Sequence, residues 1–560
     1  MRRKLSSIFI LFLLSSAQIV FSQAVKIEKK DEISPELRKE AIGFLRETAA
    51  EVGSLRSLES RISFSSEMAS LMWFADEREA RAMYQTVFND FRQLLALYDS
   101  QAGASDETPG EAGYGAPFFV GGRNNAARKL MKALSVRQQI ATSLAEHDAP
   151  LALAFFNDSA QAVGNPKIRK QIEASDAYFE TRLLSQIAAQ DVDTALKYGR
   201  KTLEKGFNRR LIEVLEKIYE KDADKGAAFG EDIVRKLKSE TVLTDKLSSF
   251  SSLLDLGAEN IEKLKGKTGK KPLFGEQSLR EIADLMAQEI IGREDIENSG
   301  AARYISQIER FSPSGAARVR QKFAVANSSR VKTVSGISAP PPPPPVRVET
   351  DRDGQKQLME NVQSLGTKQL SKEEREKTIG QARKAIANFK DPNQKLFALS
   401  ALALQISALG DRELAGQIMD EAGSLTNLQP KNYVDFMQIW MLSSGYAQID
   451  PKRAFPILEN TILRLNETIA AFVKVGEFID VGGEMIEDGE IQVGGFGGGL
   501  TRELTRNLAG ADATIQHLAK TDFAGTKGLT DKFDRAEVRL LAKMLVLRSL
   551  FGNKQEKREE

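Results

Sequence analysis

The sequence predicts an all-α protein, built as an α-solenoid-like series of helix-pair repeats in two blocks. Three observations predict this class: apolar residues recur with helical spacing, proline is scarce outside one run, and a short phrase of residues recurs at helix starts. Six of the seventeen prolines stand together at Pro340–Pro345. The remainder of the chain is therefore suited to long helices, since proline disrupts helix interiors.

The first residues resemble a secretory signal peptide, which we predict over 1–22. Basic residues Arg2 to Lys4 precede an apolar run from Ile8 to Leu14 that is too short for an uncleaved membrane anchor. Cleavage after Ser22 would change the formal charge from +2 to −1, a balance that predicts no nucleic-acid partner. We expect an exported protein, periplasmic or extracellular, whose mature form has no membrane span.

Two helical blocks are expected, an N-terminal block over 23–311 and a C-terminal block over 354–560. Between Leu458 and Phe472 an apolar residue stands at every third or fourth position, as on the buried face of a helix. Residues 312–353 lack such a period, and their proline run predicts an extended, semi-rigid linker. A polyproline stretch is also a ligand for aromatic grooves, so a docking role for this segment is the alternative.

A repeated phrase marks many helix starts: an aspartate, a small residue four positions later and a large apolar residue seven positions later. The aspartate caps the helix, the small residue lets a neighbouring helix approach, and the large residue fills the groove. Copies 31 residues apart (Asp191 to Asp222) and 39 apart (Asp411 to Asp450) leave room for one intervening helix, so each unit holds two helices. The phrase starts at Asp76, Asp148, Asp191, Asp222, Asp411 and Asp450, with a degenerate copy at Asp534.

One unit is similar to a known repeat. The segment from Leu402 to Leu425 resembles a tetratricopeptide-like α-helical repeat, with its turn and second helix matched by Gly410, Asp411, Ala415, Ile418 and Ala422. The resemblance covers about one unit and implies two antiparallel helices that stack on neighbouring pairs.

A glycine-rich segment is the first candidate binding site. It lies within a long stretch without helical pattern, 482–499. It does not match a phosphate-binding loop, because no lysine follows it and no strand precedes it. We predict a mobile loop with Phe496 at its tip that closes over a partner; a plain flexible insertion is the alternative. The predicted binding residues are Gly494, Gly495, Phe496, Gly497, Gly498 and Gly499.

An aromatic run is the second candidate. Tyr433, Phe436, Met437 and Trp440 have helical spacing, and we predict that Tyr433 and Trp440 contribute to the floor of a binding groove. Packing in the core is the alternative for these side chains.

No catalytic or metal-binding residues stand out. The chain has no cysteine and only two histidines, His147 and His517, so thiolate sites and histidine-rich zinc sites are excluded by count. We expect no metal and no cofactor. The sequence therefore predicts an exported, non-enzymatic repeat protein that mediates protein or peptide interaction in the cell envelope. Two alternatives stay open: a hydrolase of envelope polymers acting through unidentified carboxylates, and a purely structural envelope component.

Overall fold

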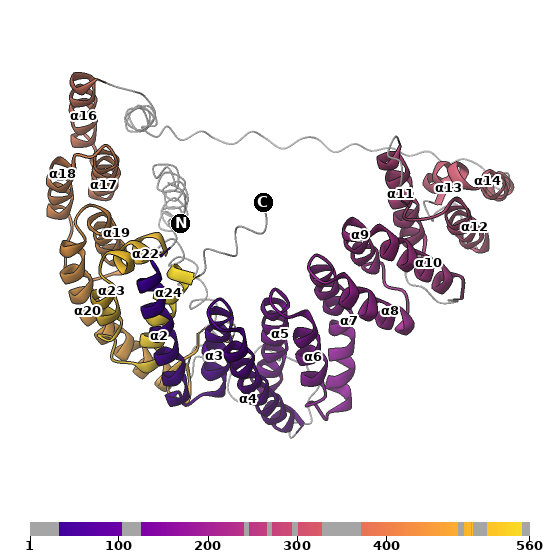
Figure 1. The fold of residues 1–560 in the computed structure, drawn as a ribbon, viewed down its shortest axis with the longest axis horizontal. Coiled ribbons are helices and arrows are strands. Elements are labelled where there is room, and N and C mark those ends of the chain that lie inside the picture. The colour runs from indigo at the N-terminus through magenta and orange to yellow at the C-terminus, as the bar shows by residue number, and fades with distance from the viewer. Residues whose placement is uncertain are drawn as a thin grey trace. The chain divides into compact units, whose positions relative to one another are not determined.

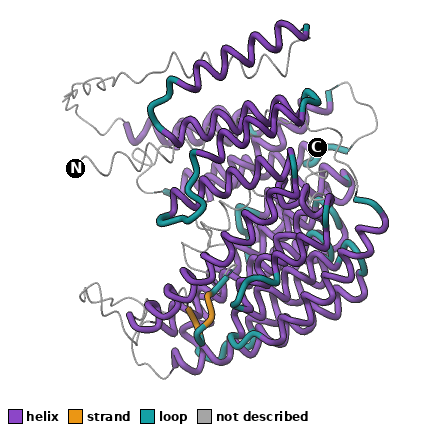
Figure 2. The backbone as a smooth tube through the Cα atoms, turned by 90° about the vertical axis from the view of Figure 1, so that its left-hand side faces the viewer, coloured by secondary structure: helices purple, strands orange, loops and turns teal. Residues whose placement is uncertain are grey.

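The computed structural model describes residues 33–103, 125–239, 246–265, 271–293, 301–327, 371–479, 486–493, 496 and 512–551 (Figure 1). The predicted signal peptide 1–22 lies outside these ranges. The predicted all-α class is confirmed, since helices make up nearly all of the described chain and the strands found there form a single two-stranded hairpin (Figure 2).

Contacts between residues divide the chain into two units, one formed by 134–343 and the other by 1–133 together with 344–560. In the inner unit most helices pack against the next and several also against the next but one. This is the solenoid-like pairing that the sequence predicts. Its elements are the C-terminal part of α5 (Asn125–Ala145), α6 (Ala149–Ala160), α7 (Pro166–Ala188), α8 (Val192–Lys205), α9 (Leu211–Lys221), α10 (Ala223–Ser239), α11 (Lys246–Leu264), α12 (Glu276–Gly292), η2 (Ala301–Tyr304), α13 (Ile305–Phe311) and α14 (Pro313–Asn327).

The outer unit is assembled from the two ends of the chain. Its late elements are α16 (Lys372–Ala387), α17 (Pro392–Ala408), α18 (Arg412–Ser424), α19 (Tyr433–Ile449), α20 (Pro451–Ile479), β1 (Ile486–Glu487), β2 (Glu490–Ile491), α22 (Asp512–Thr521), α23 (Phe523–Thr530) and α24 (Ala536–Phe551). The early helices α2 (Pro35–Glu51) and α3 (Leu58–Met72) pack against α24, and α4 (Glu77–Gly103) packs on α3 (Figure 1). The short η1 (Val52–Ser54) joins α2 to α3.

This division differs from the linear blocks expected on either side of the linker. Residues from both ends of the chain share one hydrophobic cluster, in which Phe44, Phe64 and Met72 lie with Leu547 and Phe551. The early helices thus continue the stack that the late helices begin. Local sequence pattern carries no signal for such a contact, because helical periodicity shows that a face is buried and not what covers it.

The repeated phrase does what its residue types predict. The backbone N–H of Asp148 donates to the Leu144 carbonyl at 2.8 Å and closes α5, while its carboxylate accepts from the Leu151 N–H at 2.9 Å and caps α6. One residue thereby ends one helix and starts the next. Side-chain caps of this kind are confirmed at Asp76, Asp148, Asp191, Asp222 and Asp411. The small residues four positions later are buried.

Two further copies of this turn escaped the sequence search, and one of them corrects a boundary. Asp522 caps α23 through the Gly525 N–H at 2.7 Å. Ser312 ends α13 and accepts from the Gly315 N–H at 3.1 Å, with Ala316 and Val319 fully buried below it. The linker predicted over 312–353 was therefore placed too early: residues 313–327 form α14, because serine replaces aspartate in an otherwise complete phrase.

A fully buried cation, Arg137, lies among the described residues of the inner unit. The side chain of Arg137 in α5 is 0% exposed, pairs with Asp176 of α7 and lies 4.3 Å from the centre of the Phe156 ring. Two of its nitrogens, Nε and Nη1, have no hydrogen-bond partner among the described residues. Burial lowers the pKa of Arg137 and raises that of Asp176, while their mutual attraction opposes both shifts.

Candidate functional site

The glycine segment begins at a β-hairpin that the sequence search missed. Ile486 pairs with Ile491 and Glu487 with Glu490 across a turn in which Asp488 and Gly489 have φ of 51° and 75°. Positive φ at both central residues is what a type I′ turn requires, and Asp-Gly between apolar residues is its usual signal. The dipeptide was present in the sequence and could have identified the hairpin.

The hairpin is anchored to the N-terminal helices by buried hydrogen bonds. The carboxylate of Glu490, 7% exposed, accepts from the backbone N–H groups of Arg56 at 2.8 Å and Ser57 at 3.2 Å. Gln492 donates to the Ser57 hydroxyl at 3.2 Å. These bonds satisfy amides at the start of α3 that have no partner inside the helix. The hairpin is thus a fixed junction between the two ends of the chain.

Phe496 does not lie at an exposed loop tip, as the sequence suggested. Its side chain is 3% exposed, and Val493 beside it belongs to the cluster shared by both ends of the chain. Burying a phenylalanine side chain is favourable by roughly 2 kcal/mol, which favours a buried position over an exposed one. The predicted binding residues Gly494, Gly495, Gly497, Gly498 and Gly499 lie outside the described residues.

A second cluster of polar side chains lies around Glu487 of the hairpin. Lys129 Nζ lies 2.6 and 2.7 Å from the two carboxylate oxygens of Glu487, and Tyr98 donates to Glu59 close by. Burial raises the pKa of Glu487, opposed by Lys129 and supported by Glu59. Burial, followed by the charge of Glu59, raises the pKa of Tyr98. Because Lys129 contacts both carboxylate oxygens, this group has the character of a structural ion pair.

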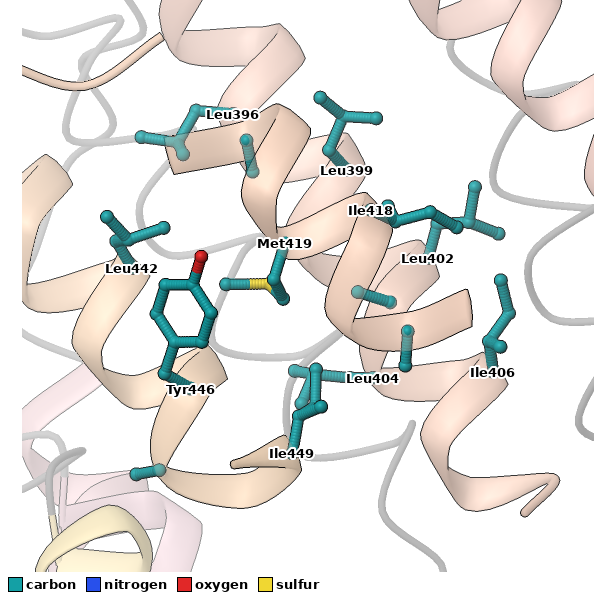
Figure 3. Packing of buried hydrophobic residues seen from close by; sticks show 14 of the residues in the cluster. Leu396, Leu399, Leu402, Leu404, Ile406, Ile418, Met419, Leu442, Tyr446 and Ile449 are labelled. Carbon is teal, nitrogen blue, oxygen red and sulfur yellow. The ribbon is translucent and has the colours of Figure 1, made fainter. Parts of the chain in front are cut away.

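The second predicted site lies on α19, whose first residue is Tyr433. The helix is capped by Asn432, which accepts from the Asp435 N–H at 3.0 Å. Its inner face enters the core formed with α17 and α18, where Leu442 and Tyr446 lie beside Met419 (Figure 3). The side chain of Trp440 is partly buried against the same cluster, so the core-packing alternative holds for a part of that side chain.

The outer face of α19 is also apolar. Val434 is 41% exposed, Met437 is half-buried, and Met441 is half-buried against the same core cluster as Trp440. These three residues stand at i, i+3 and i+7 and share one face of the helix. Phe436 and Trp440, both half-buried and four residues apart, flank them on one side. We call these five side chains the α19 face.

Two polar side chains are hydrogen-bonded to each other beside α19. Gln438 donates to the side-chain oxygen of Asn393 on α17, which leaves the Asn393 amide nitrogen as a donor. The indole N–H of Trp440 has no hydrogen-bond partner in the described part of the chain. No charged residue follows Asp435 within α19. The α19 face is therefore apolar, and the helix itself contributes no charge to it beyond Asp435.

Most of the exposed large apolar residues belong to one stretch of the sequence. Among the described residues, the large hydrophobic side chains that are exposed are Leu97, Met131, Leu425, Leu428, Val434, Leu463 and Val475. Five of these seven fall between residues 425 and 475. Single exposed apolar residues are ordinary on protein surfaces, so the exposure of each of these side chains does not by itself mark an interaction site.

The described ranges hold no group of three or more acidic or histidine side chains placed to bind a metal ion. In those same ranges, no helix combines the length and the apolar character needed to cross a membrane.

Burial lowers the pKa of His517 on α22, with Arg412 and Lys520 adding to the effect.

Comparison with known proteins gives no assignment. No family model matches the chain, and no curated protein matches it.

Proposed function

We propose that this chain is an exported, non-enzymatic helical-repeat protein that binds another protein or a peptide in the cell envelope through the α19 face. The residues that would make the contact are Val434, Met437 and Met441, flanked by Phe436 and Trp440. The tetratricopeptide-like segment directly before α19 supports this assignment by analogy, since stacked helix pairs offer extended surfaces for binding.

One observation carries the proposal: α19 is apolar on both sides, and its outer side is only partly covered. A helix that is apolar around its circumference is normally buried in the core. Here Val434 is 41% exposed, while Ile439, which lies about 140° away around the helix, is 1% exposed. Covering the outer side would remove roughly 25 cal/mol of unfavourable free energy for each square ångström of apolar surface buried. A partner is the simplest means of gaining that energy.

The test is site-specific photo-crosslinking in the native cells. A photoreactive phenylalanine analogue replaces Met437 in one variant and Leu463 in the other, a control on α20 that is itself 53% exposed. We expect a discrete protein adduct from position 437 that is absent from position 463. Adding Val434→Asp should abolish the adduct, since a carboxylate in the interface is costly to desolvate. Equal adducts from both positions, or none from position 437, would refute the proposal.

A further inference from the structure

We propose that His517 makes the attachment of α22 to the core of α17, α18 and α19 sensitive to pH, because protonation of its imidazole loosens this helix in mild acid. The inference goes beyond the proposed function and does not depend on it. Three observations carry it: the place of α22 between two hydrophobic clusters, the half-buried position of the imidazole, and the sign of the charges around it.

α22 contributes to both hydrophobic clusters of the outer unit. Leu518 belongs to the cluster formed with α17, α18 and α19. The next residue, Ala519, belongs to the cluster that the two chain ends share, and Ile515 packs against that cluster. Among the described elements, α22 packs on α19, α23 and α24. A change in how α22 is held therefore affects both clusters.

His517 directly precedes Leu518 and is half-buried. No hydrogen bond or ion pair of its imidazole is found within the described part of the chain, although its backbone carbonyl accepts from the Thr521 hydroxyl. Histidine is the side chain whose ordinary pKa, about 6.5, lies closest to neutral pH. A proton taken up here would place a charge in a partly desolvated position.

The charges that act on this imidazole are positive. Arg412 is the first residue of α18, and Lys520 stands three positions after His517 on α22. Burial is the largest cause of the lowered pKa of His517, and the charges of Arg412 and Lys520 lower it further. An imidazolium would therefore be repelled by both neighbours as well as desolvated.

The carboxylates of the surrounding elements do not compensate for this repulsion. On α22 itself, Asp512 stands five positions before His517, about 140° away around the helix. Beside Arg412, Asp411 caps α18 and Glu413 is exposed. On α19 no charged residue follows Asp435. The charged side chains described on α23, on α24 and at the two ends of α23 all have partners of their own: Asp522, Lys527, Asp531, Glu537, Arg539, Lys543 and Arg548.

The direction of the pH response follows from the lowered pKa. A histidine with a lower pKa in the folded state binds protons less tightly there than in the unfolded state. Its contribution to the stability of α22 is complete above the unfolded pKa of about 6.5. That contribution is lost as pH falls below this value and through the lower folded pKa. Detachment of α22 exposes the imidazole to water, so acid favours the detached helix.

The test is hydrogen exchange on the intact protein at about pH 7.5 and about pH 5.5, with rates corrected for the intrinsic pH dependence of amide exchange. We expect the amides of α22 to lose protection at the lower pH. His517→Gln keeps a neutral polar side chain that does not titrate, so its α22 amides should be equally protected at both values. His147→Gln is the matched control. It removes the other histidine of the chain and should leave the acid response unchanged.

A second measurement needs no substitution at position 517. The chain contains only two histidines, so NMR of histidine-labelled protein follows each imidazole separately, and His147→Gln assigns the signal of His517. We expect that signal to titrate below about pH 6.5. The inference is overturned if it titrates at or above this value, if α22 keeps its protection in acid, or if His517→Gln responds to acid as the parent does. Should His517→Gln leave α22 unprotected at both pH values, the titration of the parent protein decides.

Discussion

Gly226→Ala tests whether the small residue of the repeated phrase sets the distance between paired helices. Gly226 is the fourth residue after Asp222, and α10 meets α9 there. A Cβ atom added at this position would lie 2.5 Å from Tyr219 Cα and 2.9 Å from the Tyr219 backbone nitrogen. Because these are backbone atoms, no side-chain rotation relieves the overlap, and the two helices have to separate.

The magnitude follows from two opposing effects. Overpacking of this kind costs about 3 kcal/mol, whereas alanine gains about 1 kcal/mol over glycine within a helix. The net loss is therefore about 2 kcal/mol. Gly416→Ala is the matched control: this glycine lies in α18 with nothing within 4 Å of an added Cβ, so only the gain of about 1 kcal/mol applies.

Hydrogen exchange on the intact protein measures both variants locally, without assuming that a chain of two units unfolds in one step. We expect amides of α9 and α10 to exchange roughly 30-fold faster in Gly226→Ala, and amides of α18 to exchange no faster in Gly416→Ala. Unchanged protection of α9 and α10 would refute the reasoning. It would mean that α9 and α10 can move apart, to the spacing found in helix pairs with alanine at this position (such as Ala195), without losing stability.

Two further predictions concern charged groups. Asp176→Asn should destabilise the inner unit by about 3 kcal/mol in urea denaturation, because it leaves the buried Arg137 cation uncompensated. The double variant Arg137→Met with Asp176→Leu should recover most of that loss. An Asp176→Asn variant as stable as the parent would contradict this prediction. Hydrogen bonds from Thr194 lower the pKa of Asp191, so its contribution to stability is complete above the unfolded pKa of about 3.9 and is lost as pH falls through the lower folded value. Asp191→Asn retains the cap without titrating, and its melting temperature should fall less than that of the parent between about pH 5 and pH 2; parallel curves would speak against the assignment.

The sequence predicted local features well where residue type determines them directly. A helix-capping aspartate and a buried small residue act within one turn, so their spacing is visible in the sequence at Asp148 and Ala152. The search missed Ser312 only because it required aspartate, although serine is an equally good cap. It missed the hairpin because two-residue strands are too short to show alternation, and only Asp488 and Gly489 carried the signal.

The candidate site was predicted only in part, for a different reason. Trp440 was correctly placed on a helix, but its division between core and surface depends on what α17 and α18 cover. Phe496 was expected at a loop tip because of its glycine neighbours. Its side chain is instead 3% exposed, and the hairpin before it is bonded to residues more than 400 positions earlier in the chain, of which the composition near residue 496 contains no trace.

The junction between the chain ends also explains why the α19 face, and not the glycine segment, is the better candidate for binding. The hairpin that leads into that segment is held by Glu490, whose carboxylate joins two backbone amides of the α3 start in a buried setting. Moving it to admit a partner would leave both amides and a carboxylate without partners, which costs several kcal/mol. The α19 face requires no such opening. Its inner side is already packed, its outer side is exposed at Val434 and half-buried at Met437 and Met441, and a partner gains apolar contact without breaking a hydrogen bond of the hairpin.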